Sequence, residues 1–185
     1  MLVEVRANGF AQQLVLVLEP NRGDAMLVTP DVVWLRPRRL HRLTRVPPEL
    51  RLFNGASISD VVSVDVLGSY GATLGTASSE SEYVVDLEAA AEHVRYPRAT
   101  YRIRREGLRP VSIDFLAASG MLLKTIRFED FQTVLGRTIP TRLIVEDHVY
   151  RDSATVVLSA FSALPDVDPA TFEPDYLLSL SDVTQ

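Results

Sequence analysis

The sequence predicts a mainly β (α+β) fold: a strongly curved antiparallel sheet forming an incomplete β-barrel, with short helices as plug or lid. Apolar and polar residues alternate with a period of two in many short segments, and turn residues separate these segments at hairpin spacing. No βαβ alternation appears, so a parallel sheet is not expected. In addition, residues 14–18, 32–35 and 154–161 are apolar on both faces.

Strands that are apolar on both faces need a cover on each side, because an antiparallel sheet normally leaves one face in water. A sheet that curls around a helix or an apolar cavity covers its inner face, and a helix or loop outside covers the other. Alternatively, the second face packs wholly on protein and leaves no cavity. The sequence leaves both arrangements open.

The composition is that of a single globular domain, which we expect to span residues 1–185. The chain has 185 residues, of which 46% are hydrophobic and 23% charged, with a net charge of −5. It contains no cysteine, which excludes disulfides, thiolate metal sites and a cysteine nucleophile. No apolar run approaches the roughly eighteen residues that cross a bilayer, so the chain is not expected to span a membrane.

The first part of the chain is predicted to contain strands joined by short turns. Two strands are expected at residues 2–6 and 11–19, with a hairpin turn at Asn8-Gly9. Two more are expected at residues 26–28 and 32–35. A further strand is predicted over Arg38–Thr44, where arginines at every second residue would share one face.

One short helix is predicted after these strands. The segment Ser57-Ile58-Ser59-Asp60 has the pattern of a helix N-cap with an acidic residue in the first turn. We expect the helix to end near residues 68–70. The Gly-, Ser- and Thr-rich residues 68–81 are predicted to form a surface loop.

The second half is predicted to be a meander of hairpins. Its strands are expected at residues 82–87, 101–104, 111–115, 121–128, 137–150 and 154–161. Tyr101 and Ile103 alternate with arginines and are expected to point inward. Ser119-Gly120 is the predicted tip of a hairpin, and residues 168–172 resemble a capped helical turn.

Residues typical of catalysis or metal binding are present, but they form no known pattern. His41, His93 and His148 are the only histidines, and their spacing is not that of metal ligands. His148 and Asp147 are neighbours that would point to opposite faces of a strand. No Gly-x-Ser-x-Gly elbow or glycine-rich phosphate loop appears. We therefore expect no catalytic residue, no metal and no cofactor.

Arginines are concentrated between residues 36 and 51, where the only acidic residue is Glu49. Arg38 and Arg42 are candidate contacts for acidic lipid head groups or an acidic partner. The alternative is a solvated strand face that discourages edge pairing. Nucleic acid is not an expected partner, because the chain is acidic overall and no aromatic stripe interleaves with the arginines.

Several segments resemble the outer-membrane lipoprotein-sorting proteins, the LolA/LolB-like superfamily of periplasmic carriers. In chain order they are WLRP, RRLHRL, LFNGASISDV, GLRPVSIDFLAASGMLLKTIRFEDF, IPTRLIVEDH, SATVVLSAF and FEPDYLL. The resemblance covers roughly residues 10–180. The family usually carries a secretory signal and an N-terminal helix that do not appear in this sequence, and we expect the signal to have been removed.

The resemblance implies non-catalytic binding and carriage of a lipid or lipid-modified protein in the periplasm. The bulkiest apolar residues of the strands and turns would then line an acyl-chain cavity: Leu16, Trp34, Phe53, Tyr101, Phe115, Leu143 and Phe161. The short helix would act as a lid through Ile58, Val61 and Val62. Implied partners are acyl chains, an inner-membrane transporter and an outer-membrane acceptor. The alternative is a protein-interaction or sensor domain of the cell envelope that carries no cargo.

Overall fold

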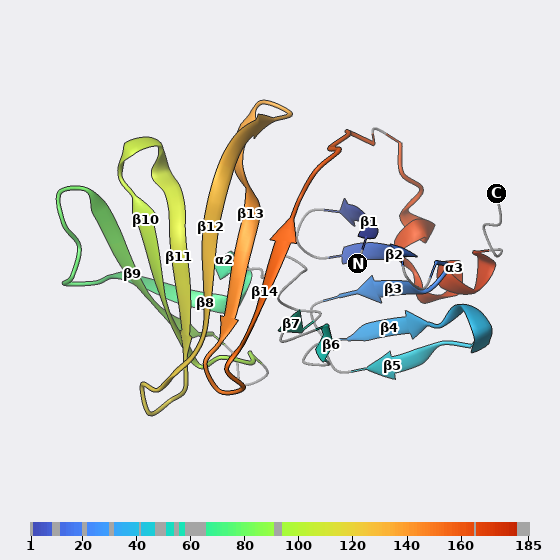
Figure 1. The fold of residues 1–185 in the computed structure, drawn as a ribbon, viewed down its shortest axis with the longest axis horizontal. Helices are drawn as coiled ribbons and strands as arrows, with labels where there is room; N and C mark the ends of the chain where they lie inside the picture. Colours follow the sequence, from blue (N-terminus) through green and yellow to red (C-terminus); the bar gives the residue numbers. More distant parts are fainter. Residues whose placement is uncertain are drawn as a thin grey trace. The chain divides into compact units, whose positions relative to one another are not determined.

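The computed structural model divides the chain into two compact units. The five-stranded unit comprises residues 1–50, 57–65 and 164–185, and the seven-stranded unit comprises residues 51–56 and 66–163 (Figure 1). Within them the structure describes residues 2–8, 12–19, 22–29, 32–40, 42–46, 51–53, 56–57, 66–90, 94–164 and 166–180.

The five-stranded unit contains one antiparallel sheet in which neighbours in sequence are neighbours in space. Its strands are β1 (Leu2–Asn8), β2 (Gln12–Glu19), β3 (Ala25–Val28), β4 (Val33–Arg36) and β5 (Thr44–Val46). The predicted hairpin between the first two strands is confirmed by their antiparallel pairing. Successive residues of β2 and β3 are apolar, and buried residues therefore lie on both faces of the sheet at these strands.

One face of this sheet packs against two short helices. These are the 3₁₀ helix η3 (Pro169–Phe172) and helix α3 (Pro174–Ser179). Phe172 and Leu177 from the helices form a core with Leu14 and Leu27 of the sheet. Asp168 caps η3 by accepting a 2.9 Å hydrogen bond from the Ala170 N–H, as the predicted capped turn requires. The opposite face also contains buried residues, which are the apolar Val15, Val17, Met26, Val28 and Val33 and the polar Gln13.

The predicted strand over Arg38–Thr44 is wrong in its first part. Residues Arg38–Leu40 form a 3₁₀ helix, η1, and the strand β5 begins only at Thr44. Two local causes are visible. The Arg38 N–H donates a 2.7 Å hydrogen bond to the Asp24 carboxylate, and the Leu40 N–H donates to the Pro37 carbonyl. Both N–H groups therefore form hydrogen bonds other than those of a sheet, and the arginines do not share a strand face.

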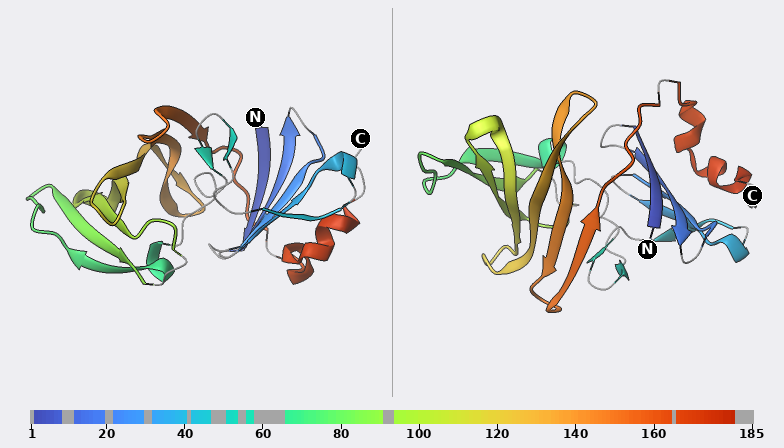
Figure 2. Two further views of the ribbon diagram at one scale, coloured as in Figure 1. Left: turned by 90° about the horizontal axis from the view of Figure 1, so that it is seen from below. Right: turned by 45° about the horizontal axis from the view of Figure 1, so that its top comes forward.

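The seven-stranded unit is a continuous antiparallel meander from β8 to β14, which confirms the predicted series of hairpins. In Figure 1, β8 runs nearly across the direction of β12 and β13, and Figure 2 shows the sheet curling from β8 to β14. The strands are β8 (Tyr70–Leu74), β9 (Glu82–Ala89), β10 (Arg98–Arg104), β11 (Arg109–Leu116), β12 (Leu122–Val134), β13 (Arg137–Asp147) and β14 (Asp152–Val157).

In this unit the structure corrects two predicted boundaries and confirms one hairpin tip. Residues 68–81 are not only a loop, because β8 pairs with β9 over Tyr70–Leu74. The last strand ends at Val157, so Phe161 lies beyond it, in contrast to the predicted strand at 154–161. The hairpin tip at Ser119-Gly120 is confirmed: both residues are exposed, and Gly120 has a positive φ of 87° that favours glycine.

The segment between the two large sheets contains two short strands, β6 (Arg51–Phe53) and β7 (Ala56–Ser57), and a helical turn α2 (Val66–Ser69). Ser57 belongs to β7, so the helix does not begin there as predicted. The predicted lid residues Ile58, Val61 and Val62 lie outside the described residues, as does the predicted cap at Asp60.

Candidate functional site

The seven-stranded sheet carries an apolar row that crosses its whole width. Each strand contributes one residue, and consecutive residues of the row are paired across neighbouring strands. In sheet order the row is Leu74, Val85, Tyr101, Ile113, Ile126, Val145 and Ala154. With strands about 4.8 Å apart, the row is about 29 Å long.

The row one residue away points to the other face and is polar throughout. Its members are Thr73, Asp86, Thr100, Asp114, Thr125, Glu146 and Ser153. Side chains of a strand alternate between faces, so these two rows define an apolar face and a polar face of one sheet. The predicted inward position of Tyr101 and Ile103 agrees with this alternation.

Some residues of the apolar face are fully buried, whereas others are partly open. Phe115 and Val145 are each only 1% exposed, and Ile113 and Ile126 are buried beside them. Tyr101, Phe128, Leu143 and Val156 are half-buried on the same face. The partly open side chains are therefore large and apolar and share this face with fully buried ones.

Aromatic rings pack on this face. Tyr96 stacks on Phe115 with 4.5 Å between ring centroids, and Tyr101 meets Phe128 edge-on at 6.2 Å. The Tyr70 hydroxyl donates a 3.0 Å hydrogen bond to the Tyr96 carbonyl. Burial raises the pKa of Tyr101 and raises the pKa of Tyr70 to about 12. Both phenols are neutral at physiological pH, as ordinary tyrosines are, and their burial further disfavours the charged form.

One end of the apolar face carries two buried charged residues. Lys124, the only lysine of the chain, is 2% exposed and lies directly opposite Asp147 in the β12–β13 register. The Asp147 Oδ1 accepts hydrogen bonds from the N–H groups of Val149 and Tyr150, at 3.1 and 2.9 Å. Sequence analysis missed this pair, although Lys124 is in phase with Ile126 and Phe128.

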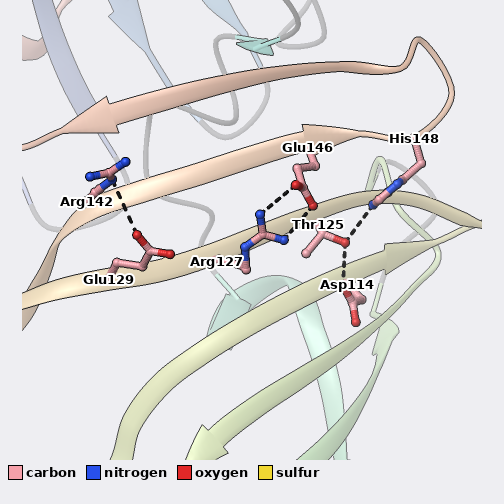
Figure 3. Close-up of polar contacts among 7 residues, drawn as sticks. All are labelled: Asp114, Thr125, Arg127, Glu129, Arg142, Glu146 and His148. Atoms are coloured by element: carbon pink, nitrogen blue, oxygen red, sulfur yellow. Dashed lines mark hydrogen bonds and ion pairs between the residues drawn. The ribbon is translucent and has the colours of Figure 1, made fainter.

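The polar face carries ion pairs and a chain of hydrogen bonds (Figure 3). Arg127 donates two hydrogen bonds of 2.7 Å to the Glu146 carboxylate, and Arg142 lies 3.5 Å from Glu129. The hydrogen bond and charge of Glu146 raise the pKa of Arg127, and those of Arg127 lower the pKa of Glu146. These pairs join β12 to β13 on the side that faces water.

The histidine singled out in the sequence belongs to this polar face. The Thr125 hydroxyl donates a 2.7 Å hydrogen bond to the Asp114 carboxylate and lies 2.9 Å from the His148 Nε2. Because the hydroxyl hydrogen is used by Asp114, the His148 Nε2 must donate to Thr125. In this arrangement His148 does not take a proton from the hydroxyl.

The proposed cavity residues fall in different parts of the structure. Tyr101, Phe115 and Leu143 share the apolar face of the seven-stranded sheet. Leu16 and Trp34 pack in the helix-covered core of the five-stranded unit, where the Arg45 guanidinium lies 4.6 Å from the Trp34 ring centroid.

The remaining candidates are less informative. Phe161 lies after β14 and is 40% exposed. Phe53 belongs to β6, but its side chain is outside the described residues. Arg38 and Arg42 are exposed, and an Arg38 Nη1 donates to the Arg22 carbonyl at 3.4 Å.

Among the described residues, no group of three or more His, Asp or Glu side chains is placed to hold a metal ion. In the same part of the chain, no helix has the length and apolar character that would let it cross a membrane.

Comparisons with known proteins identify the fold and the family. The LolA superfamily protein from Nitrosomonas europaea superposes with a TM-score of 0.79 at 28% identity, over 94% of this chain and 81% of its own length. A protein-family model with the description "Uncharacterized protein" matches residues 9–179. The chain belongs to this family, and its fold is that of the LolA superfamily.

Two further structures share the LolA-like fold at lower identity. One is a "putative outer membrane lipoprotein-sorting protein domain" from Vibrio parahaemolyticus, with a TM-score of 0.74 and 16% identity over 95% of this chain and 82% of that one. The other is a DUF1329 family protein from Desulfovibrio piger, with a TM-score of 0.77 and 17% identity over 95% of this chain and 81% of that one. A search of curated proteins found no match.

Proposed function

We propose that this LolA-like chain binds the acyl chain of a lipid or lipid-modified protein and carries it without chemical change. The observation that supports this most is the apolar row across the seven-stranded sheet, backed one residue away by a wholly polar row. An apolar sheet face suits an acyl chain, because the chain has no groups that form hydrogen bonds.

The size of the row suits such a ligand. Its length of about 29 Å is close to the hydrocarbon thickness of a bilayer, about 30 Å, which two acyl chains span end to end. Each methylene removed from water contributes about 0.8 kcal/mol, so even half the row gives substantial affinity. Ile113 and Ile126 are buried, so an acyl chain would first contact the half-buried residues of the face, which are Tyr101, Phe128, Leu143 and Val156. It would reach the buried residues only if the groups packed against them moved.

The arrangement of polar groups supports a non-catalytic role. The best-connected set of hydroxyl, imidazole and carboxylate, Thr125, His148 and Asp114, directs the hydroxyl hydrogen to Asp114. The hydroxyl thus contacts the carboxylate directly, so the set lacks the order hydroxyl–imidazole–carboxylate of a hydrolase triad. The set also lies on the polar face, away from the apolar row.

The comparisons support the setting of this proposal. The name of the Vibrio parahaemolyticus domain refers to outer-membrane lipoprotein sorting. We accordingly propose a periplasmic location, an inner-membrane transporter as donor and an outer-membrane protein as acceptor. We also propose that residues 1–185 form one LolA/LolB-like domain, in which Phe53 and Phe161 contribute to the lining, Ile58, Val61 and Val62 to a lid, and Arg38 and Arg42 to head-group contacts.

The test is binding of a dansyl-labelled fatty acid by two matched variants. Leu143 and Ile144 are adjacent in β13 and both half-buried, but Leu143 lies on the apolar face and Ile144 on the polar one. We expect Leu143→Glu to weaken binding about tenfold or more while Ile144→Glu does not, because only the first places a charge beside the acyl chain. Equal binding by both variants, with melting temperatures confirming folding, would refute the proposal.

A protein-interaction module is the second candidate, and the outer strand β8 favours it. Residues Gly71–Leu74 are exposed and uncharged, and Leu74 is 65% exposed. An uncharged edge strand can pair with an extended segment of another chain. A proline at Ala72 would disrupt such pairing without touching the apolar row, so pull-down that depends on Ala72, with no fatty-acid binding, would favour this candidate.

A further inference from the structure

The lower end of the seven-stranded sheet in Figure 1 presents a group of exposed apolar side chains. Two neighbouring hairpin turns, β11–β12 and β13–β14, supply them. Met121 is 58% and Leu122 38% exposed in the first, and Val149 is 55% and Tyr150 65% exposed in the second. We name these four residues the apolar tip. Single exposed apolar residues are common, but four on adjacent turns are not.

Hydrogen bonds hold the two turns together. The His148 N–H donates a 2.9 Å bond to the Leu123 carbonyl and so ties one turn to the other. The Asp147 carboxylate accepts from the N–H groups of Val149 and Tyr150, and the Ala117 N–H donates to the Met121 carbonyl. Several backbone groups of the apolar tip are therefore hydrogen-bonded within the protein, which favours contact with a nonpolar medium, where unpaired N–H and C=O groups are costly.

Charge is distributed around the tip rather than within it. Between Asp114 and Lys124 the chain has nine consecutive uncharged residues, FLAASGMLL. Charged residues of both signs lie near this end of the sheet: exposed Arg95, Arg98 and Arg151, with Glu88 opposite Arg98 in the β9–β10 register and Asp152 after Arg151. An apolar centre with a tyrosine at its margin and charged groups around it matches the interface of a phospholipid bilayer, where rings and cations lie at the head groups.

The opposite end of the same sheet differs. There, Leu108 and Leu135 are each 67% exposed, one in each of two hairpin turns. Leu108 is followed directly by Arg109, and Leu135 lies in a run of six uncharged residues, FQTVLG, which is shorter than the run of nine at the tip. Leu135 is therefore a control with a similar apolar side chain and similar exposure.

We propose that the apolar tip inserts into the surface of a phospholipid bilayer and docks the protein there. This docking does not rest on the proposed carriage of acyl chains, since the tip lies at the end of the sheet and the acyl site on its face. A partner protein is the competing occupant. The uncharged run and the exposed Tyr150 favour the bilayer, because aromatic rings are enriched at the boundary between membrane and water.

Site-specific fluorescence tests the proposal, because the chain has no cysteine to interfere with labelling. Met121→Cys and Leu135→Cys are each labelled with the polarity-sensitive dye NBD and mixed with vesicles of phosphatidylcholine and phosphatidylglycerol in a four-to-one ratio. We expect NBD emission to increase and shift to the blue at position 121 and to stay unchanged at position 135. Equal responses at the two positions, or none at either, would overturn the proposal.

Vesicle flotation of charged variants separates docking from cargo binding. We expect Met121→Glu to weaken vesicle binding about tenfold, because the side chain can no longer leave water, and Leu135→Glu to leave it unchanged. Leu143→Glu should retain vesicle binding even though it loses fatty-acid binding. Unchanged binding by Met121→Glu, or self-association through the tip in sedimentation without any vesicle binding, would contradict bilayer docking.

Discussion

The Arg36 guanidinium donates a 2.7 Å hydrogen bond from Nη2 to the carbonyl of Leu180, which lies 144 residues further along the chain. Its Nη1 donates a 3.2 Å bond to the Gly23 carbonyl, and the side chain is only 2% exposed. Leu180 caps the C-terminus of α3, where backbone carbonyls lack partners within the helix. Arg36 thus connects the β2–β3 turn, the end of β4 and the end of α3.

We expect Arg36→Met to lower the free energy of unfolding by about 2 kcal/mol, because it removes two charged hydrogen bonds and deprives the part-buried Gly23 and Leu180 carbonyls of this donor. Hydrogen exchange in residues 174–180 should accelerate at the same time. Arg39→Met is the control, since Arg39 is exposed on η1, and it should change stability by less than about 0.5 kcal/mol. Unchanged exchange in α3 would show that Arg36 does not hold this helix.

Because Phe115 stacks on Tyr96, truncation of the Phe115 side chain should destabilise the fold strongly. Phe115 is 1% exposed on the apolar face, so Phe115→Ala should lower the free energy of unfolding by about 3–5 kcal/mol. Phe161 is 40% exposed, and Phe161→Ala should cost much less. Chemical denaturation of both variants measures the difference. Similar losses would mean that Phe161 belongs to a core.

The Arg127–Glu146 pair predicts a pH-dependent contribution to stability. Arg127 lowers the pKa of Glu146 below its ordinary value of 4.5, so the pair stabilises the fold above that pH and loses its effect as the pH falls further. Both side chains are about one-third exposed or more, so the effect at pH 7 should stay under about 1 kcal/mol. Urea unfolding should show a deficit of Glu146→Gln at pH 7 that disappears near pH 3. A deficit independent of pH would contradict this account.

Tyr70 is expected to make the stability of the fold decrease at high pH. Burial raises its pKa to about 12, so the folded protein holds this proton more tightly than the unfolded chain does. The resulting stabilisation is complete below pH 10, the ordinary value for tyrosine, and is lost as the pH rises towards 12. Absorbance of the phenolate should show a late-titrating tyrosine that is absent in Tyr70→Phe. Its persistence in that variant would assign the titration to another residue.

The sequence allowed the β class, the hairpin order and part of the apolar face to be predicted, because period-two alternation is local. Tyr101 and Ile103 followed from that pattern. Arg38–Leu40 did not, because hydrogen bonds from the turn, including the one to Asp24, outweigh the alternation. The strand β8 contains Gly71 and Ala72, which disfavour strands, and it forms by pairing with β9.

The proposed lining residues could be predicted less well. Each was chosen as the bulkiest apolar residue of its segment, and this criterion does not distinguish two separate cores. Leu16 and Trp34 pack beneath α3 and η3, while Phe115 and Leu143 lie on the other sheet. Lys124 was missed because a charged residue on an apolar face contradicts the expectation that charges face water.

Photocrosslinking tests the central claim, acyl binding on the apolar face of the seven-stranded sheet, most directly. A fatty acid with a diazirine near its methyl end is bound, irradiated and mapped by mass spectrometry. The account predicts adducts at Tyr101, Phe128, Leu143 or Val156 and none at the polar-face neighbours Thr100, Ile144 and Thr155. Adducts concentrated on the polar face, or confined to the helix-covered core around Leu14 and Leu27, would contradict it.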